Sequence, residues 1–146
     1  MVKLHEITKD NYEECLALSV SENQMSYVAS NTYSLAQAWV YKNTAFPFAI
    51  YLDELIVGFI MLGYYEVLQR YNLWRFMIDK KYQGRGYGKQ ALLIGINYLV
   101  KNFNVKEIFT SVVPENIHAK KLYNIVGFNE TGELSGNEIV MKLLIE

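Results

Sequence analysis

The chain has 146 residues, of which 51% are hydrophobic and 14% aromatic. This length fits one domain, so we expect residues 1–146 to form a single unit with a packed core, and the composition argues against intrinsic disorder. The formal net charge is -1, from 14 basic and 15 acidic residues, which excludes the strongly basic footprint of a nucleic-acid-binding protein. A small cationic substrate needs only local acidity and stays compatible with this charge.

The cysteine content and the N-terminus predict a cytoplasmic protein. The single cysteine, Cys15, rules out an internal disulfide and fits a reducing compartment. The first residues, Met1 to Glu6, lack the apolar core of a secretory signal. No stretch approaches the roughly 18 to 20 apolar residues that a membrane-spanning helix needs, so we expect no association with a membrane.

Apolar periodicity and turn residues predict the element order β-α-α-β-β-β-α-β-α-β-β. The predicted strands are residues 2–7, 46–52, 55–65, 70–78, 106–113, 128–133 and 139–145. The predicted helices are residues 11–18, 34–41, 88–101 and 117–125, the last capped by Asn116 and ended by Gly127. Residues 19–32 are polar and lack strong periodicity, so a loop with a short helical turn is expected there.

Three glycines, Gly84, Gly86 and Gly88, alternate with other residues between a predicted strand and a predicted helix. Glycine allows close approach of the backbone, and the free N–H groups at the start of a helix attract anions. The turn therefore predicts a ligand that contains phosphate. Its G-x-G-x-G spacing differs from the G-x-G-x-x-G of dinucleotide-binding folds, and Gln90 replaces the Ser or Thr that a P-loop needs for magnesium.

A second motif follows, and its key residues are Asn116, Ala119, Leu122, Tyr123, Gly127 and Phe128. The first motif reads Gln83-Gly84-Arg85-Gly86-Tyr87-Gly88 and fits the pattern Q/R-x-x-G-x-G/A. Together they resemble the two acetyl-CoA motifs of the GNAT family of N-acetyltransferases. The resemblance implies an α+β fold in which four helices flank a mixed, mostly antiparallel, twisted sheet of about seven strands. It also implies that acetyl-CoA is the acetyl donor.

The resemblance assigns the contacts with coenzyme A. Amides of the glycine loop would bind the pyrophosphate, and Arg85 and Lys89 would add positive charge. The end of the preceding strand would offer its main chain to the thioester and the pantetheine arm. The full set of expected cofactor-binding residues is Met77, Ile78, Gln83, Gly84, Arg85, Gly86, Tyr87, Gly88, Lys89, Asn116, Lys120 and Tyr123.

Acetyl transfer from a thioester to an amine needs a neutral amine, stabilisation of the oxyanion and a proton for the leaving thiolate. Tyr123 matches the family tyrosine that acts as general acid, and a phenol pKa of about 10 is not far above that of a thiol. Several polyamine acetyltransferases of the family have a glutamate on the strand before the loop, where this chain has Trp74 and Arg75. The candidate bases are therefore Glu22, Glu66 or a chain of water molecules.

Substrate choice is expected to reside in the first two helices, the loop between them and the strand ends. Residues 24–39 are similar to the corresponding segment of bacterial spermine and spermidine acetyltransferases. Aromatic faces and carboxylates suit an aliphatic ammonium ion, which predicts a di- or polyamine substrate. The expected substrate-binding residues are Glu22, Tyr27, Tyr64, Glu66 and Trp74, whereas Tyr33 and Trp39 are expected to pack in the core.

Three other functions remain open at this point. The acceptor could be a peptide or protein N-terminus, or an aminoglycoside-type amine, and the chain could instead be a noncatalytic acyl-CoA sensor. A metal site is not expected, because His5 and His118 are isolated from other ligand residues. Apolar residues in the segment 139–145 permit a homodimer as well as an inner strand of a monomer.

Overall fold

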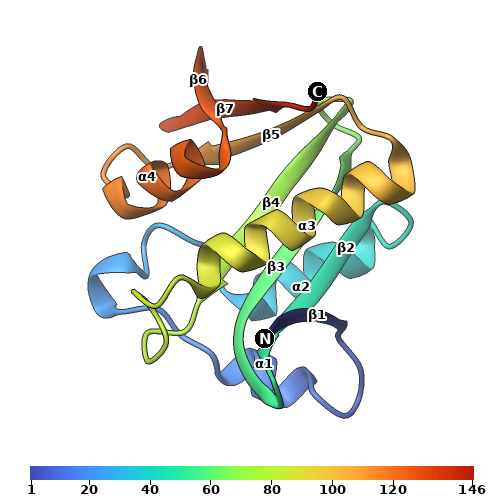
Figure 1. Cartoon of the computed structure of the whole chain (residues 1–146), viewed down its shortest axis with the longest axis vertical. Coiled ribbons are helices and arrows are strands. Elements are labelled where there is room, and N and C mark those ends of the chain that lie inside the picture. Colours follow the sequence, from blue (N-terminus) through green and yellow to red (C-terminus); the bar gives the residue numbers. More distant parts are fainter.

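The computed structural model describes residues 1–146 and confirms the predicted α+β fold and element order (Figure 1). The strands are β1 (Val2–Glu6), β2 (Ala45–Leu52), β3 (Leu55–Tyr65), β4 (Arg70–Ile78), β5 (Glu107–Val112), β6 (Asn129–Ser135) and β7 (Glu138–Leu144). The helices are α1 (Tyr12–Ala17), α2 (Asn31–Val40), α3 (Tyr87–Phe103) and α4 (Ile117–Val126), with a short 3₁₀ turn, η1 (Glu22–Gln24). None of the helices combines the length and the apolar composition that crossing a bilayer requires.

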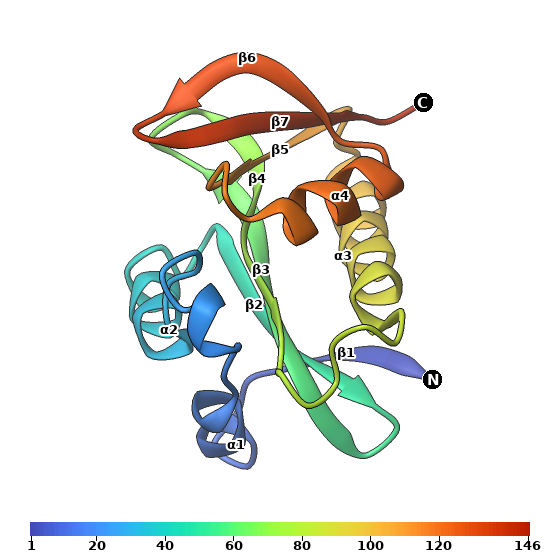
Figure 2. The same cartoon turned by 90° about the vertical axis from the view of Figure 1, so that its left-hand side faces the viewer.

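The strands form one seven-stranded sheet in the order β1-β2-β3-β4-β5-β7-β6. Every neighbouring pair is antiparallel except β4 and β5, which are parallel. Helices α1 and α2 cover one face of the sheet, and α3 and α4 cover the other (Figure 2). The central strand β4 is thus the last strand of the N-terminal antiparallel part, and β5 is the first strand of the C-terminal part.

Strands β4 and β5 separate soon after they meet. Their only paired residues are Asn72 and Phe109, and Thr110 Oγ1 then donates a hydrogen bond of 3.2 Å to the Leu73 carbonyl. Beyond Leu73 the side of β4 that faces β5 makes no ladder hydrogen bonds. An unpaired strand edge inside a protein leaves polar backbone groups free for a ligand, so this divergence positions the site described below.

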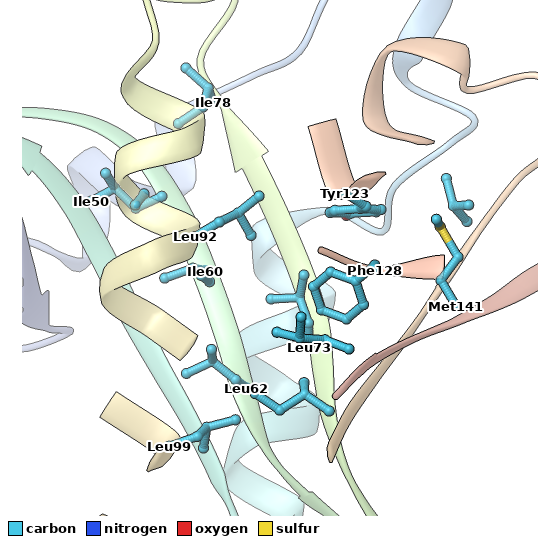
Figure 3. Packing of buried hydrophobic residues seen from close by; sticks show 14 of the residues in the cluster. Ile50, Ile60, Leu62, Leu73, Ile78, Leu92, Leu99, Tyr123, Phe128 and Met141 are labelled. Atoms are coloured by element: carbon cyan, nitrogen blue, oxygen red, sulfur yellow. The ribbon is translucent and has the colours of Figure 1, made fainter. Parts of the chain in front are cut away.

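The larger core cluster lies on the α3 and α4 face of the sheet (Figure 3). As the helical spacing predicts, Leu92 and Leu99 of α3 are fully buried, and they pack toward Ile60 and Leu62 of β3. Burial of a side chain of this size contributes about 1.5–3 kcal/mol. This packing fixes α3, and therefore the glycine loop at its start, against the sheet.

The second core cluster, on the α1 and α2 face, corrects two expectations. Trp39 is 72% exposed and Tyr33 is also exposed, so neither packs in the core. Helix α2 instead buries the smaller residues Asn31, Ser34 and Ala38. The Trp39 ring lies on the outer side, where the Lys42 Nζ stands 4.8 Å from the ring centroid.

Cys15 belongs to this second cluster and is fully buried. Burial raises the pKa of its thiol from 9.0 to about 11, and the thiolate is the reactive form. We expect Ellman's reagent at pH 8 to label the native protein at least about 100-fold more slowly than the protein unfolded in urea. Equal labelling rates in the two conditions would contradict the buried position of this side chain.

Candidate active site

The loop between β4 and α3 is hydrogen-bonded to η1 and to the segment that precedes it. The buried Asp79 carboxylate accepts hydrogen bonds from the Ser19 and Lys81 amides, each at 3.0 Å. Gln83 Nε2 donates to the Ile78 carbonyl at 2.9 Å and to Gln24 Oε1 at 3.0 Å. Because carboxylate–amide bonds are among the stronger hydrogen bonds, the start of the glycine loop is held in one position.

The amides of the glycine loop are free to bind a ligand. No N–H group from Gln83 to Lys89 donates to another group of the protein, and the first helical bond of α3 runs from the Gln90 amide to the Gly86 carbonyl at 3.3 Å. Gly84 and Gly86 adopt φ angles of 77° and 83°, which favour glycine. The first turn of α3 contains no acidic residue. The free donors and the positive end of the helix dipole together fit a phosphate group.

A cavity of about 300 Å³ lies beside these amides, and we call it the loop-side cavity. Gly88 leaves little room for a side chain, since a Cβ there would stand 3.2 Å from both the Leu122 and the Phe76 side chains. The expected cofactor-binding residues that line the cavity are Met77, Ile78, Gln83, Gly84, Gly86, Tyr87, Gly88, Lys89 and Asn116. The remaining lining residues are Val20, Gln24, Tyr27, Val28, Phe76, Tyr82, His118, Ala119, Leu122 and Ile125. Of these, Tyr27 was expected to bind the substrate, and Ala119 and Leu122 belong to the second motif.

Three expected cofactor residues, Arg85, Lys120 and Tyr123, do not line this cavity. Arg85 is exposed in the loop, where its side chain faces solvent. Lys120 lies on the other side of α4, where its Nζ pairs with Glu130 of β6 at 3.4 Å. The helical period explains this difference, because Ala119 and Leu122 line the cavity and place Lys120 on a different face.

A second cavity, of about 390 Å³, lies between the diverging ends of β4 and β5, and we call it the strand-side cavity. Its lining includes Trp74, Arg75, Phe76 and Tyr123. The two cavities share the residues Tyr27, Val28, Phe76 and Asn116. They therefore meet at the point where β4 leaves β5, and a ligand in one cavity can reach a ligand in the other.

Tyr123 of α4 lines the strand-side cavity, and its ring packs beside Phe76, which both cavities share. The residue is 6% exposed, and its ring packs between Phe76 and Phe128, with ring centroids 6.5 Å and 5.7 Å away. Figure 3 shows Tyr123 beside Phe128. Burial raises the pKa of Tyr123 above its usual value; the charge of Glu138 raises it further, and a hydrogen bond with Thr110 lowers it in part. The phenol therefore keeps its proton at neutral pH and can act as a proton donor.

Of the expected substrate-binding residues, Tyr27 and Trp74 line the strand-side cavity and three others do not. Glu22 is exposed in η1, and Glu66 is exposed in the turn after β3. Tyr64 lies on the α3 face, with its ring 5.2 Å from that of Tyr71. Glu22, Tyr64 and Glu66 therefore line neither of the two cavities.

Comparisons with known proteins agree with this geometry. The sequence model of the acetyltransferase (GNAT) family matches residues 3–128. The spermine/spermidine N(1)-acetyltransferase of Bacillus subtilis strain 168 is 36% identical over 154 aligned residues, which cover 98% of this chain and 99% of the relative.

Solved structures share the fold. A spermidine N-acetyltransferase from Vibrio cholerae, in complex with CoA and spermine, superimposes with a TM-score of 0.76 at 20% identity, covering 98% of this chain and 95% of that one. A PaiA N-acetyltransferase from Thermoplasma acidophilum, in complex with coenzyme A, gives a TM-score of 0.74 at 15% identity and covers 99% of both chains. With its two motifs, its free loop amides and this family match, the chain belongs to the GNAT family and is an N-acetyltransferase that takes its acetyl group from acetyl-CoA.

Proposed function

We propose that this enzyme transfers an acetyl group from acetyl-CoA to a primary amine of a di- or polyamine such as spermidine or spermine. The observation that carries the proposal is the 36% identity, over 98% of the chain, with a relative named for spermine and spermidine acetylation. The strand-side cavity supports it, because it combines aromatic faces with a carboxylate, Glu138. Such a lining attracts an aliphatic ammonium ion.

In this proposal the loop-side cavity holds the donor. The free amides from Gln83 to Lys89 bind its diphosphate, and the Lys89 ammonium adds positive charge. The end of β4, whose edge toward β5 is unpaired, receives the arm that leads to the thioester. The acetyl group then stands where the two cavities meet, within reach of an amine in the strand-side cavity.

The amine attacks the thioester carbonyl directly, so a carbon–nitrogen bond forms as the carbon–sulfur bond breaks. Tyr123 donates its proton to the departing thiolate, and its buried phenol recovers a proton from the acceptor side. The proton of the incoming ammonium leaves through water in the polar strand-side cavity, since Glu22 and Glu66 lie outside it. Holding both reactants in adjoining cavities supplies the proximity that the reaction needs.

A panel of acceptors tests the proposed substrate. Initial rates of coenzyme A release are measured with spermidine, spermine, a lysine-containing peptide and an aminoglycoside, each with saturating acetyl-CoA. We expect kcat/KM for the polyamines to exceed that for the other acceptors by at least about 100-fold, because only they fit a narrow cavity with one carboxylate. Turnover of the peptide or the aminoglycoside alone would contradict the polyamine assignment.

A further inference from the structure

Glu138 is a carboxylate in the strand-side cavity that no sequence motif indicates. It is the first residue of β7, directly after the turn that joins β6 to β7, and it is half-buried. Ser111 of β5 donates a hydrogen bond of 3.1 Å from its Oγ to Glu138 Oε1. The neighbouring strand therefore orients the carboxylate, and the side chain is the only acidic one that lines this cavity.

Glu138 makes no direct ion pair within the protein, although its charge interacts at longer range with that of Arg75. Other carboxylates of the C-terminal strands form ion pairs, as Glu133 does with Arg70 at 2.9 Å and Glu107 does with Lys142 at 3.6 Å. Glu138 forms none. An ionised group in a partly buried cavity is stabilised when it is paired, so this carboxylate is available to a cation from outside the protein.

Arg75 is the basic residue that could pair with Glu138 inside the cavity, but its terminal nitrogens donate hydrogen bonds to other groups. Its Nη1 donates to the Trp74 carbonyl at 2.7 Å, and its Nη2 donates to Gln37 Oε1 at 3.1 Å. Arg75 is the only basic residue in the lining. The cavity thus contains one cationic and one anionic side chain: the terminal nitrogens of Arg75 are hydrogen-bonded elsewhere, whereas the Glu138 carboxylate accepts only from Ser111. Tyr27 and Trp74 supply aromatic faces in the same lining.

The charge of Glu138 also acts on Tyr123, the proposed general acid. It raises the pKa of the Tyr123 phenol, which lines the same cavity. Coulomb interactions in a partly buried site act over short distances and weaken with separation. A cation that binds to this carboxylate therefore stands close to the position where the acetyl group is transferred.

We propose that Glu138 is the carboxylate that recognises the acceptor: it receives an ammonium group of the amine in the strand-side cavity and directs it toward the acetyl group beside Tyr123. This role rests on the proposed function and names the residue that selects a cationic acceptor. Ser111 is a positioning residue, because its hydroxyl orients the carboxylate and touches no reacting atom in this arrangement.

The substitution Glu138→Gln tests this role, since it keeps the shape and removes the charge. We expect the KM for spermidine to rise by roughly 10- to 100-fold, the scale of one lost charge-assisted hydrogen bond, while the KM for acetyl-CoA changes by less than about twofold. Added salt should raise the wild-type KM for spermidine more than that of the variant, because salt screens the attraction. Ser111→Ala should raise the same KM by a smaller factor.

The matched control is Glu107→Gln, which removes the same charge from a residue on β5 that pairs with Lys142 and lies outside the strand-side cavity. Its KM for spermidine should equal the wild-type value. A Glu138→Gln enzyme with the wild-type KM and the wild-type salt dependence would overturn the role of Glu138. If the wild-type enzyme acetylates another amine instead of polyamines, the proposed substrate is wrong. The KM of the wild type and of Glu138→Gln for that amine then tests the role of Glu138 in the same way. If Glu138→Gln fails to fold, Ser111→Ala decides instead, and an unchanged KM would overturn the role.

Discussion

Replacing Tyr123 by phenylalanine is expected to lower kcat by about 100- to 10,000-fold, which is the range for loss of a general acid. The KM for acetyl-CoA should change by less than about twofold, because the loop amides and not the phenol hold the diphosphate. Steady-state rates with spermidine and acetyl-CoA measure both quantities. The ring itself remains in place between Phe76 and Phe128, so the variant should fold as the parent does.

The pH dependence separates this role from a purely structural one. A general acid must be protonated, so activity falls as pH rises through its pKa. Burial raises the pKa of Tyr123, so the wild-type kcat should not fall as pH rises to about 10, where an unperturbed phenol would already be half ionised. Tyr71→Phe is the control, since Tyr71 lies on the α3 face away from both cavities. A Tyr123→Phe enzyme with the wild-type kcat would contradict the assignment.

Replacing Gly86 by valine is expected to raise the KM for acetyl-CoA by at least about 30-fold, a loss of some 2 kcal/mol of binding. Gly86 has a φ of 83° and caps the start of α3, where a β-branched side chain costs roughly 1–2 kcal/mol. A Cβ there meets no atom within 4 Å, so the loop can relieve the strain only by changing its backbone. The aligned amides would then no longer converge on the diphosphate.

Gly132 provides a matched control for this substitution. It has a φ of 86°, and a Cβ there also meets nothing within 4 Å, but it lies on β6 away from the loop-side cavity. Because the strain is the same, Gly132→Val and Gly86→Val should lower Tm by similar amounts, about 2–8 °C. Only Gly132→Val should leave the KM for acetyl-CoA unchanged. Equal effects of the two substitutions on that KM would show that the loop amides are not the binding groups.

The parts of this site that the sequence predicts are those built from one continuous segment. The glycine loop and the start of α3 follow each other in the chain, so the spacing of Gly84, Gly86 and Gly88 predicts both the turn and the free amides. The motif that begins at Asn116 is also local. The side chain of Asn116 caps α4 by accepting from the Ala119 amide at 3.4 Å, as predicted, and it lines both cavities.

The acceptor side is different because five separate segments build it. Residues 26–29, 73–76, 110–113 and 137–138 meet Asn116 and Tyr123 of the α4 segment only where β4 and β5 diverge, and no local pattern indicates that meeting. Glu138 and its partner Ser111 were therefore not predicted. The predicted carboxylates, Glu22 and Glu66, lie in the loop after the first helix and at the end of β3, where substrate contacts were expected. Both are exposed in the fold.

Strand faces are also hard to predict across a bulge. The pairing of β3 with β4 shifts register between Met61 and Leu62, which changes how the following residues alternate. The extra residue is Trp74, which consequently lies on the α2 face with its ring 5.0 Å from that of Tyr65. Strict alternation would have placed Trp74 on the α3 face with Phe76 and Ile78. A strict alternation in the sequence gives no sign of this shift.

The initial-velocity pattern tests most directly the claim that the acetyl group passes straight from acetyl-CoA in the loop-side cavity to an amine in the strand-side cavity. Rates are measured over a range of acetyl-CoA concentrations at several fixed concentrations of spermidine. Direct transfer requires both substrates to be bound at once, so double-reciprocal plots should give intersecting lines. Parallel lines would indicate an acetylated enzyme as an intermediate and would contradict the account.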